Sequence, residues 1–216
     1  MRMAAHELLE TSEALRTKAA EIEQHGLFAN QCQDQNLKSI LKKHQQQMIT
    51  AYQQGINLLQ GKGGQVTHTH PDFNAYHENF GMQQSTMAPP NPNNRTLSDQ
   101  SISTLALNAH KTGSVYSMVW ANECVDPQIR SYHVNGAILC QEMAYEIWQW
   151  MNHNGYYSPP TFHETQINQI TNAFQPIGNM STINSMNSIN SMNSANSMNA
   201  MNPLQMNSPN PMRTYS

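Results

Sequence analysis

The sequence predicts an all-α protein, in which two antiparallel helix hairpins joined by a long crossover form a four-helix bundle with a C-terminal tail. Apolar residues recur at helical spacing in four stretches, at about 4–25, 30–60, 98–123 and 127–154. Short turns divide each hairpin, whereas residues 61–97 form a long connection without helical periodicity. We therefore expect a bundle over residues 1–160 and a low-complexity tail over residues 161–216.

The first predicted helix covers residues 4–25. Its apolar stripe advances in steps of three and four residues and contains Ala5, Leu8, Ser12, Leu15, Ala19 and Ile22. A glycine just after the last turn of a helix commonly adopts the left-handed conformation that ends it. His25-Gly26 therefore predicts the C-terminal end of this helix.

The second predicted helix covers residues 30–60 and returns beside the first. Its stripe contains Leu37, Leu41, His44, Met48, Ala51, Gly55 and Leu58. The glycine-rich segment Gly61-Lys62-Gly63-Gly64 predicts the end of this helix and the start of the crossover.

The third predicted helix begins at Ser98, a favourable N-cap, and has Asp99 in its first turn, where the helix dipole favours an acid. The fourth begins with Asp126 as its cap and Pro127 at the first helical position, and ends at Gly155. Because Asp126-Pro127 stops one helical pattern and starts another at once, these two helices must form an antiparallel hairpin.

The apolar stripes of the third and fourth helices also predict their register. We expect large residues to face small ones, with Tyr116 beside Gly136 and Met143 beside Ala109. The same alignment gives the pairs Ile102–Trp150, Leu105–Ile147, Thr112–Cys140 and Val119–His133. It also places Glu123 against Arg130 and Lys111 against Glu142, as exposed charge pairs that help to fix the register.

The long connection indicates how the two hairpins are joined. Residues 61–97 can span a helix of about 40 Å and return the chain to its far end. Two hairpins joined by one long crossover are typical of a ferritin-like four-helix bundle. The sequence therefore predicts that arrangement.

The chain leaves the predicted bundle after Gly155. A short helix is predicted within residues 161–174. The segments that start at Ile183, Ile189 and Ala195 then repeat with a six-residue period. A parallel β-helix is one interpretation of such a period, but the Asn/Ser/Met composition favours a flexible, adhesive tail.

The composition argues against several classes of function. Only 12% of residues are charged and the formal net charge is −3, so we expect no nucleic-acid-binding surface. No stretch approaches the roughly 20 apolar residues of a membrane-spanning helix. Acidic residues interrupt the N-terminus where a signal peptide needs its apolar run, so we expect synthesis in the cytoplasm. The cysteines Cys32, Cys124 and Cys140 have no metal-binding spacing and are expected to be unpaired.

A ferritin-like bundle raises the hypothesis of a di-iron or di-manganese centre, which needs glutamates from two helices and a Glu-x-x-His from each of the others. The second helix has no glutamate, the third has Glu123 only at its end, and the fourth has Glu142 and Glu146 without a Glu-x-x-His. Motifs for a nucleophile elbow, a phosphate loop or a dinucleotide site are also missing from the sequence. We therefore predict no catalytic residues, no metal ligands and no cofactor.

Histidines supply the remaining candidates for a metal site. His44 and His133 lie on apolar stripes, where a hydrogen-bonded core histidine is the ordinary interpretation. The crossover carries a second group, His68, His70 and His77 with Asp72 and Glu78. We favour a polar loop there over a weak surface metal site.

Residues 97–160 carry landmarks that resemble the spore coat F family of endospore-forming bacteria. The landmarks are Leu97-Ser98-Asp99, Lys111, the turn Glu123-Cys124-Val125-Asp126-Pro127-Gln128-Ile129-Arg130, and Met151-Asn152-His153-Asn154-Gly155-Tyr156-Tyr157. The histidine-bearing crossover and the Asn/Ser/Met tail lie outside this resemblance.

The resemblance implies a ferritin-like structural component of the spore coat with no catalytic residues, made in the mother-cell cytoplasm. Its partners would be other spore coat proteins, with self-association left open, and neither nucleic acid nor a membrane span is implied. The alternative is a ferritin-like metal-binding protein or metalloenzyme with an irregular His/Glu site.

Overall fold

The structure, a computed structural model, describes residues 3–66 and 89–176. These residues form the α-helices α1 (Ala5–Gln31), α2 (Gln35–Leu59), α3 (Asp99–Glu123), α4 (Pro127–His153) and α5 (Glu164–Thr171). The described residues contain no strand, which confirms the predicted all-α class. The chain divides into two units, Met1–Thr161 with α1 to α4 and Phe162–Ser216 with α5.

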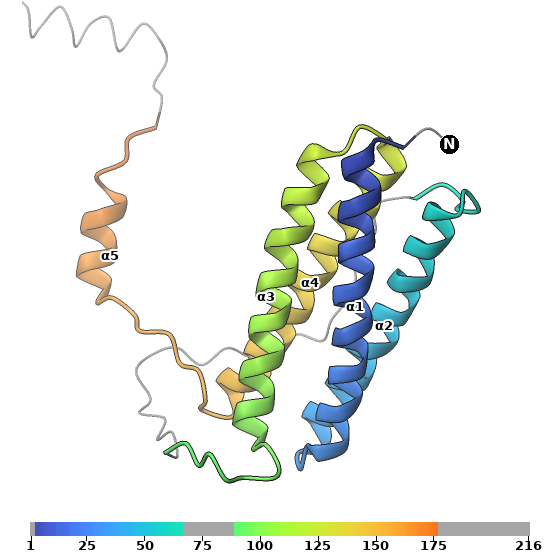
Figure 1. Cartoon of the computed structure of the whole chain (residues 1–216). Coiled ribbons are helices and arrows are strands. Elements are labelled where there is room, and N and C mark those ends of the chain that lie inside the picture. The colour runs from blue at the N-terminus through green and yellow to red at the C-terminus, as the bar shows by residue number, and fades with distance from the viewer. Residues whose placement is uncertain (1–2, 67–88, 177–216) are drawn as a thin grey trace, which may run out of the picture. The chain divides into compact units, whose positions relative to one another are not determined.

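The four long helices lie side by side in Figure 1, where α1 packs mainly against α2 and α3, and α4 packs against the same two helices. Glu7 near the start of α1 contacts the α3–α4 turn, and Asp99 at the start of α3 contacts the α1–α2 turn. Helix α1 therefore begins at the end of the unit where α3 finishes. It follows that adjacent helices are antiparallel throughout this unit.

Helix α1 continues past the end predicted for it at His25-Gly26 and stops at Gln31. The prediction was wrong because tertiary packing extends the helix, with Phe28 and Ala29 buried in the core. Gly26 instead allows a close approach, since a Cβ there would lie 2.8 Å from Nε2 of Gln45. The turn is thus moved along the chain, and α2 begins at Gln35 instead of residue 30.

The helix starts follow local sequence chemistry. The carboxylate of Asp34 accepts a hydrogen bond from the Leu37 N–H at 2.8 Å and caps α2. Asp126 caps α4 in the same way, by accepting from the N–H groups of Gln128 and Ile129, with Pro127 at the first helical position. Ser98 caps α3. Each cap satisfies backbone donors that the first turn of a helix leaves unpaired.

The two hairpins repeat each other at one constant offset along the chain. Ala29-Asn-Gln-Cys-Gln-Asp34 at the first turn corresponds to Ala121-Asn-Glu-Cys-Val-Asp126 at the second. The same offset relates Leu37 to Ile129, the first fully buried residues of α2 and α4. Helices α1 and α2 therefore correspond to α3 and α4, residue by residue.

Each hairpin turn is held by an acidic side chain of the other hairpin. One carboxylate oxygen of Glu7 accepts from the N–H groups of Val125 and Asp126 at 2.7 Å and 2.6 Å. Asp99, the counterpart of Glu7, accepts from the N–H groups of Gln33 and Asp34 at 2.9 Å and 2.8 Å. These reciprocal clamps lie at opposite ends of the unit and tie the hairpins together.

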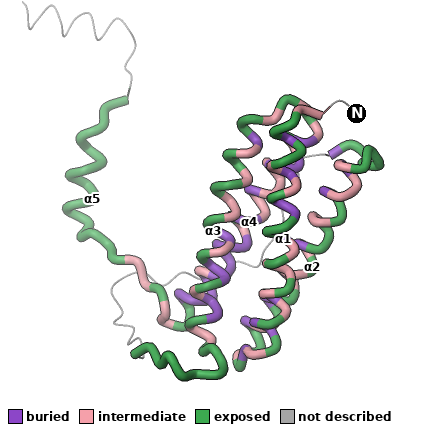
Figure 2. The backbone as a smooth tube through the Cα atoms, viewed as in Figure 1, coloured by how far each residue is buried: buried purple, intermediate pink, exposed green. Residues whose placement is uncertain are grey.

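The largest apolar core lies near the α1–α2 turn, where buried segments of all four helices meet in Figure 2. Its buried members are Phe28, Ala29, Cys32, Leu37, Ile40, Leu41, Ile102, Ala106, Leu107, Ala144, Ile147, Trp150 and Met151. A smaller cluster of Leu58, Val66 and Tyr132 lies toward the opposite end. Apolar burial is therefore concentrated at one end of the helices.

The predicted α3–α4 register is wrong by one residue of α3. Gly113, not Thr112, faces Cys140, because a Cβ on this glycine would lie 3.1 Å from the cysteine Sγ. Likewise Ser117 faces Gly136, and the ring of Trp120 lies 5.6 Å from that of His133. The prediction assumed that bulky apolar residues point inward. Small residues of α3 face α4 instead, and Leu105, Tyr116 and Val119 are exposed.

The two predicted charge pairs change with the register. Among the described residues, neither Glu123–Arg130 nor Lys111–Glu142 comes within ion-pair distance. Nζ of Lys111 lies 5.5 Å from the ring centroid of Tyr157. Glu123 lies beside Glu10 of α1, and both burial and this neighbouring carboxyl raise the pKa of Glu10.

Candidate functional site

A cavity of about 790 Å³, partly open to solvent, lies between the two hairpins in the half of the unit away from the main core. Residues of all four long helices line it, among them Lys18, Gln47, Gly113, Tyr132 and Cys140. The small residues Gly113, Ser117 and Gly136, which lie where α3 and α4 meet, also line the cavity. A space of this size and mixed lining is within the range of ligand sites.

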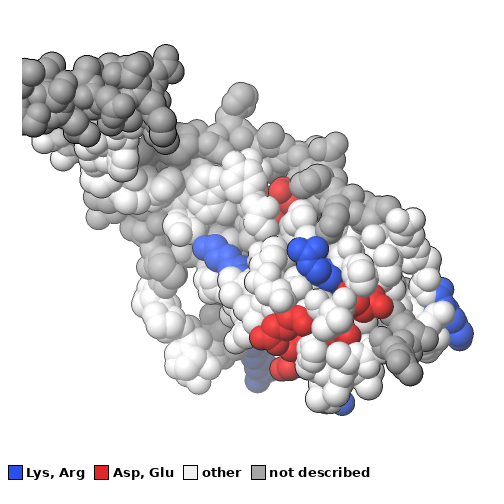
Figure 3. Space-filling model, turned by 90° about the horizontal axis from the view of Figure 1, so that it is seen from above, with Lys and Arg blue, Asp and Glu red and all other residues white. Residues whose placement is uncertain are grey.

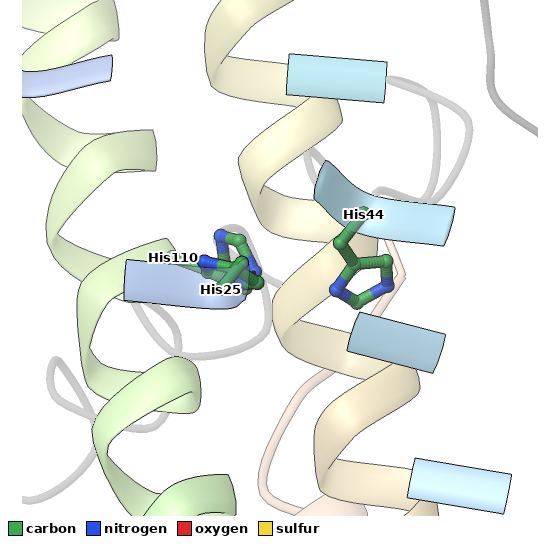
Figure 4. A group of neighbouring side chains, drawn as sticks. All are labelled: His25, His44 and His110. Carbon is green, nitrogen blue, oxygen red and sulfur yellow. Dashed lines mark hydrogen bonds between the residues drawn. The ribbon is translucent and has the colours of Figure 1, made fainter. Parts of the chain in front are cut away.

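Three fully buried histidines lie about one helical turn from the cavity, at the boundary with the main core. His25 comes from α1, His44 from α2 and His110 from α3, and Figure 4 shows the three rings gathered between these helices. One nitrogen of each ring lies within 4.8 Å of the corresponding nitrogens of the other two. The chain folds so that three helices place imidazoles at one point.

Hydrogen bonds fix the proton position on two of these rings. Nδ1 of His25 lies 2.8 Å from the backbone carbonyl oxygen of Glu21, which can only accept, so this nitrogen carries the proton. Nε2 of His25 is then an acceptor in the neutral ring and lies 3.1 Å from Nε2 of His110. Nε2 of His44 lies 2.8 Å from a carboxylate oxygen of Glu146 and donates to it.

Burial keeps the three imidazoles in their neutral form. It lowers the pKa of His25 to about 4, although the Glu21 carbonyl opposes the shift. Burial also lowers the pKa of His44 and, together with the neighbouring His44 and His25, lowers the pKa of His110 well below its usual value. Neutral imidazole is the form that binds metal ions.

Glu146 of α4 completes this polar layer. One carboxylate oxygen accepts from His44 and the other pairs with the ammonium group of Lys43. Burial raises the pKa of Glu146, but the hydrogen bonds from His44 and Lys43 outweigh it, and the net pKa lies below the ordinary value. The carboxylate is therefore charged at neutral pH and holds the His44 ring in one orientation.

A fourth buried histidine, His133, lines the cavity outside the cluster. Its Nε2 lies 3.1 Å from the hydroxyl oxygen of Thr11, and its ring packs against Tyr132 and Trp120. Burial lowers its pKa to about 4. These contacts are those of a hydrogen-bonded core histidine.

The structure assigns the sequence landmarks of the second hairpin to its turn and its end. Asp126 and Pro127 start α4, while Glu123 and Arg130 are exposed on either side of the turn and Glu142 is partly exposed on α4. Gly155 follows α4 with a φ of 73°, the left-handed conformation that glycine adopts readily. Tyr156 and Tyr157 then donate their backbone N–H groups to the Met151 carbonyl, and Tyr156 packs on Trp150.

The other predicted candidates fall in different places. His68, His70 and His77 lie outside the described residues, as does the hexapeptide repeat. His44 is brought into the cluster, whereas the sequence pattern indicates only a helix end at His25 and gives no signal at His110. Their shared inward position depends on the length of α1 and the rotation of α3, which the sequence did not predict. The repeated Ala-Asn-x-Cys-x-Asp motif is the signal that could have aligned the hairpins.

Comparisons with known proteins identify a family for the second hairpin. The family model of the Coat F domain matches residues 98–161, which contain α3 and α4, so the resemblance predicted from the sequence is confirmed. The spore coat protein F-like protein YhcQ of Bacillus subtilis (strain 168) is 25% identical over 173 residues, which cover 79% of this chain and 80% of that protein.

A solved structure supports the fold of the larger unit. A protein from Bacillus halodurans C-125, provisionally named a spore coat protein, matches with a TM-score of 0.57 and 17% identity, over 76% of this chain and 97% of the other. At this identity the likeness concerns the fold alone. Within the described residues, no helix has the length and apolar character needed to cross a bilayer.

Proposed function

We propose that the chain is a structural component of the bacterial spore coat, built on a ferritin-like four-helix bundle and acting through assembly with other coat proteins. The observation that carries this proposal is the match of the Coat F domain to residues 98–161. A relative that spans most of the chain also carries a spore coat name. Both relationships favour a structural role over a catalytic one.

The surface of the bundle is compatible with such packing. Figure 3 views one end of the bundle, where a few acidic and basic side chains gather in the middle and the surface around them is neutral. Helix α3 in addition presents Val115, Met118 and Val119 on one outer face, with 64%, 41% and 47% of their surfaces exposed. We expect this α3 face to contact neighbouring coat proteins, because exposed apolar surface is stabilised by burial in an interface.

Fluorescent fusions in sporulating cells test the proposal. The wild-type fusion is expected to accumulate around the forespore and to remain on mature spores. Val115→Lys/Met118→Lys should reduce retention several-fold, since it places two charges in the α3 face without entering the core. A diffuse wild-type signal throughout the mother cell would contradict a coat role.

Two further fusions distinguish the contribution of the α3 face to retention from a general effect of added charge and from the contribution of the tail. Gln46→Lys/Gln53→Lys adds the same charge at exposed polar positions of α2 and should be retained like the wild type. A fusion without residues 176–216 tests the tail, which we expect to strengthen retention without affecting the fold of the bundle. Equal retention of the two lysine variants would show that the α3 face is not a coat contact.

A further inference from the structure

The histidine cluster has a geometry close to that of a metal site. Zinc binds imidazole nitrogen at about 2.0–2.1 Å, so two nitrogens on a tetrahedral ion lie roughly 3.3–3.4 Å apart. The Nε2 atoms of His25 and His110 are 3.1 Å apart, near that separation. The ligand atom of His44 is within 4.8 Å of both, so its imidazole has at most about 1.5 Å to move.

The contacts behind the cluster are those that metal-binding histidines use. Such histidines almost always donate their second N–H to a backbone carbonyl or a carboxylate, which fixes the tautomer and the ring orientation. His25 donates to the Glu21 carbonyl and thereby turns Nε2 toward His110. His44 donates Nε2–H to Glu146, which leaves Nδ1 as the nitrogen for a ligand bond.

We propose that His25, His44 and His110 bind one divalent transition-metal cation of the zinc class, with the Glu21 carbonyl and the Glu146 carboxylate orienting two of the rings. Three neutral imidazoles suit zinc, copper, nickel or ferrous ions better than magnesium or calcium, which prefer oxygen ligands. Glu146 orients and does not bind the ion, because its two oxygens are engaged by His44 and Lys43.

The ordinary alternative is three core histidines with no ligand. Helix packing does not require histidine at two of these places, because the positions equivalent to His25 and His44 in the second hairpin are Ser117 and Gly136. Burying three polar rings together also costs free energy that apolar side chains would not. Nδ1 of His110 is buried without a hydrogen-bond partner among the described residues. A cluster whose only role was to fill the core would be expected to pair this polar atom.

The position of the cluster suggests how an ion would enter and how its binding would affect the stability of the fold. We expect an ion to enter from the cavity between the hairpins, which ends about one helical turn from the cluster. The bound ion would join α1, α2 and α3, and therefore both hairpins. Because the unfolded chain does not present this arrangement, binding would stabilise the folded state.

Zinc titration of the untagged, chelator-stripped full-length chain tests the proposal. Calorimetry with zinc chloride should show one equivalent bound per chain and a raised unfolding temperature. His25→Ser, which installs the residue of the equivalent position, should lower zinc affinity roughly 100-fold or more. Glu146→Gln should lower it roughly 10- to 100-fold, because His44 loses its orienting carboxylate.

Two control variants locate the bound ion. His133→Leu removes a buried histidine outside the cluster and introduces leucine, the residue found at the equivalent position 41 of the first hairpin. This variant should bind zinc like the wild type. His68→Ala/His70→Ala/His77→Ala removes the crossover histidines and should also leave the affinity unchanged. Loss of binding in the crossover variant, with His25→Ser unaffected, would overturn the proposal.

A measurement on the wild-type protein removes any dependence on how the variants fold. X-ray absorption at the zinc edge should show about three imidazole nitrogens at roughly 2.0–2.1 Å from the ion. An oxygen-only environment, or no zinc retained after dialysis against metal-free buffer, would overturn the proposal.

Discussion

The two hairpins share their framework and differ in the layer between the main core and the cavity. Both have an Ala-Asn-x-Cys-x-Asp turn, an aspartate cap on the returning helix and an acid that clamps the opposite turn. In the middle layer, the first hairpin has His25 and His44 where the second has Ser117 and Gly136. The shared positions build the fold, whereas the differing positions supply two histidines of the cluster and two residues that line the cavity.

This difference separates positions that are needed for the fold from positions at which the residue can change and take part in binding. The caps and clamps satisfy backbone donors at helix ends, so any folded version of the hairpin needs them or a substitute. The middle layer has no such constraint, since histidine, serine and glycine all occupy it in a helix. Substitutions in the framework should therefore affect stability, and substitutions in the middle layer should mainly affect binding.

Removing the more buried clamp should have the largest effect on stability. Glu7→Ala leaves the N–H groups of Ala4, Val125 and Asp126 without their acceptor, and we expect a loss of about 3 kcal/mol in the free energy of unfolding. Asp99→Ala should cost about 1–2 kcal/mol, because this clamp is more exposed and holds two donors. Urea unfolding measures both, and an equal or smaller loss for Glu7→Ala would contradict the ranking.

The Glu7 clamp should make the free energy of unfolding depend on pH. Burial raises the pKa of Glu7, but hydrogen bonds from the backbone of Asp126, Ala4 and Val125 outweigh it and leave the pKa below its ordinary value. The folded state therefore favours the charged form, so the stabilisation is complete above the unfolded pKa of about 4.3. It is lost as pH falls through the lower pKa of the folded protein.

Comparison with Glu7→Gln measures that contribution. Unfolding free energies between pH 7 and pH 3 should fall more steeply for the wild type than for the variant, which has no charge to lose at this position. Parallel pH profiles for the two proteins would show that Glu7 does not contribute in this way.

Replacement by alanine should change the stability of the protein in opposite directions at two glycines with different neighbours. A Cβ at Gly55 of α2 would lie 2.5 Å from the Tyr132 hydroxyl and 2.8 Å from a Leu15 methyl, so Gly55→Ala should destabilise the protein by about 1 kcal/mol. At Gly136 of α4 the nearest side-chain atom, Oγ of Ser117, would lie 3.4 Å away. Gly136→Ala should therefore stabilise the protein by about 0.5 kcal/mol through helix propensity. Thermal unfolding gives the sign of each change.

Local features of the fold could be predicted from the sequence, and features set by long-range packing could not. The Asp126-Pro127 turn was predictable because a cap and a first-turn proline act within a few residues. The end of α1 was not, since burial of Phe28 and Ala29 outweighs the glycine signal at Gly26.

The histidine cluster illustrates the same limit. Each histidine taken alone resembles a core residue or a helix end, and only the fold shows that His25, His44 and His110 meet. The one-residue change in the α3 register decides this, because it turns His110 inward and Val119 outward. Small residues facing α4 gave no apolar signal from which that rotation could be predicted.

Fractionation of purified mature spores tests the coat role most directly. We predict that immunoblotting detects the full-length protein in the coat fraction, released only by detergent with reductant or alkali, and not in the core extract. Detection solely in the spore core or the mother-cell cytosol would contradict a coat role.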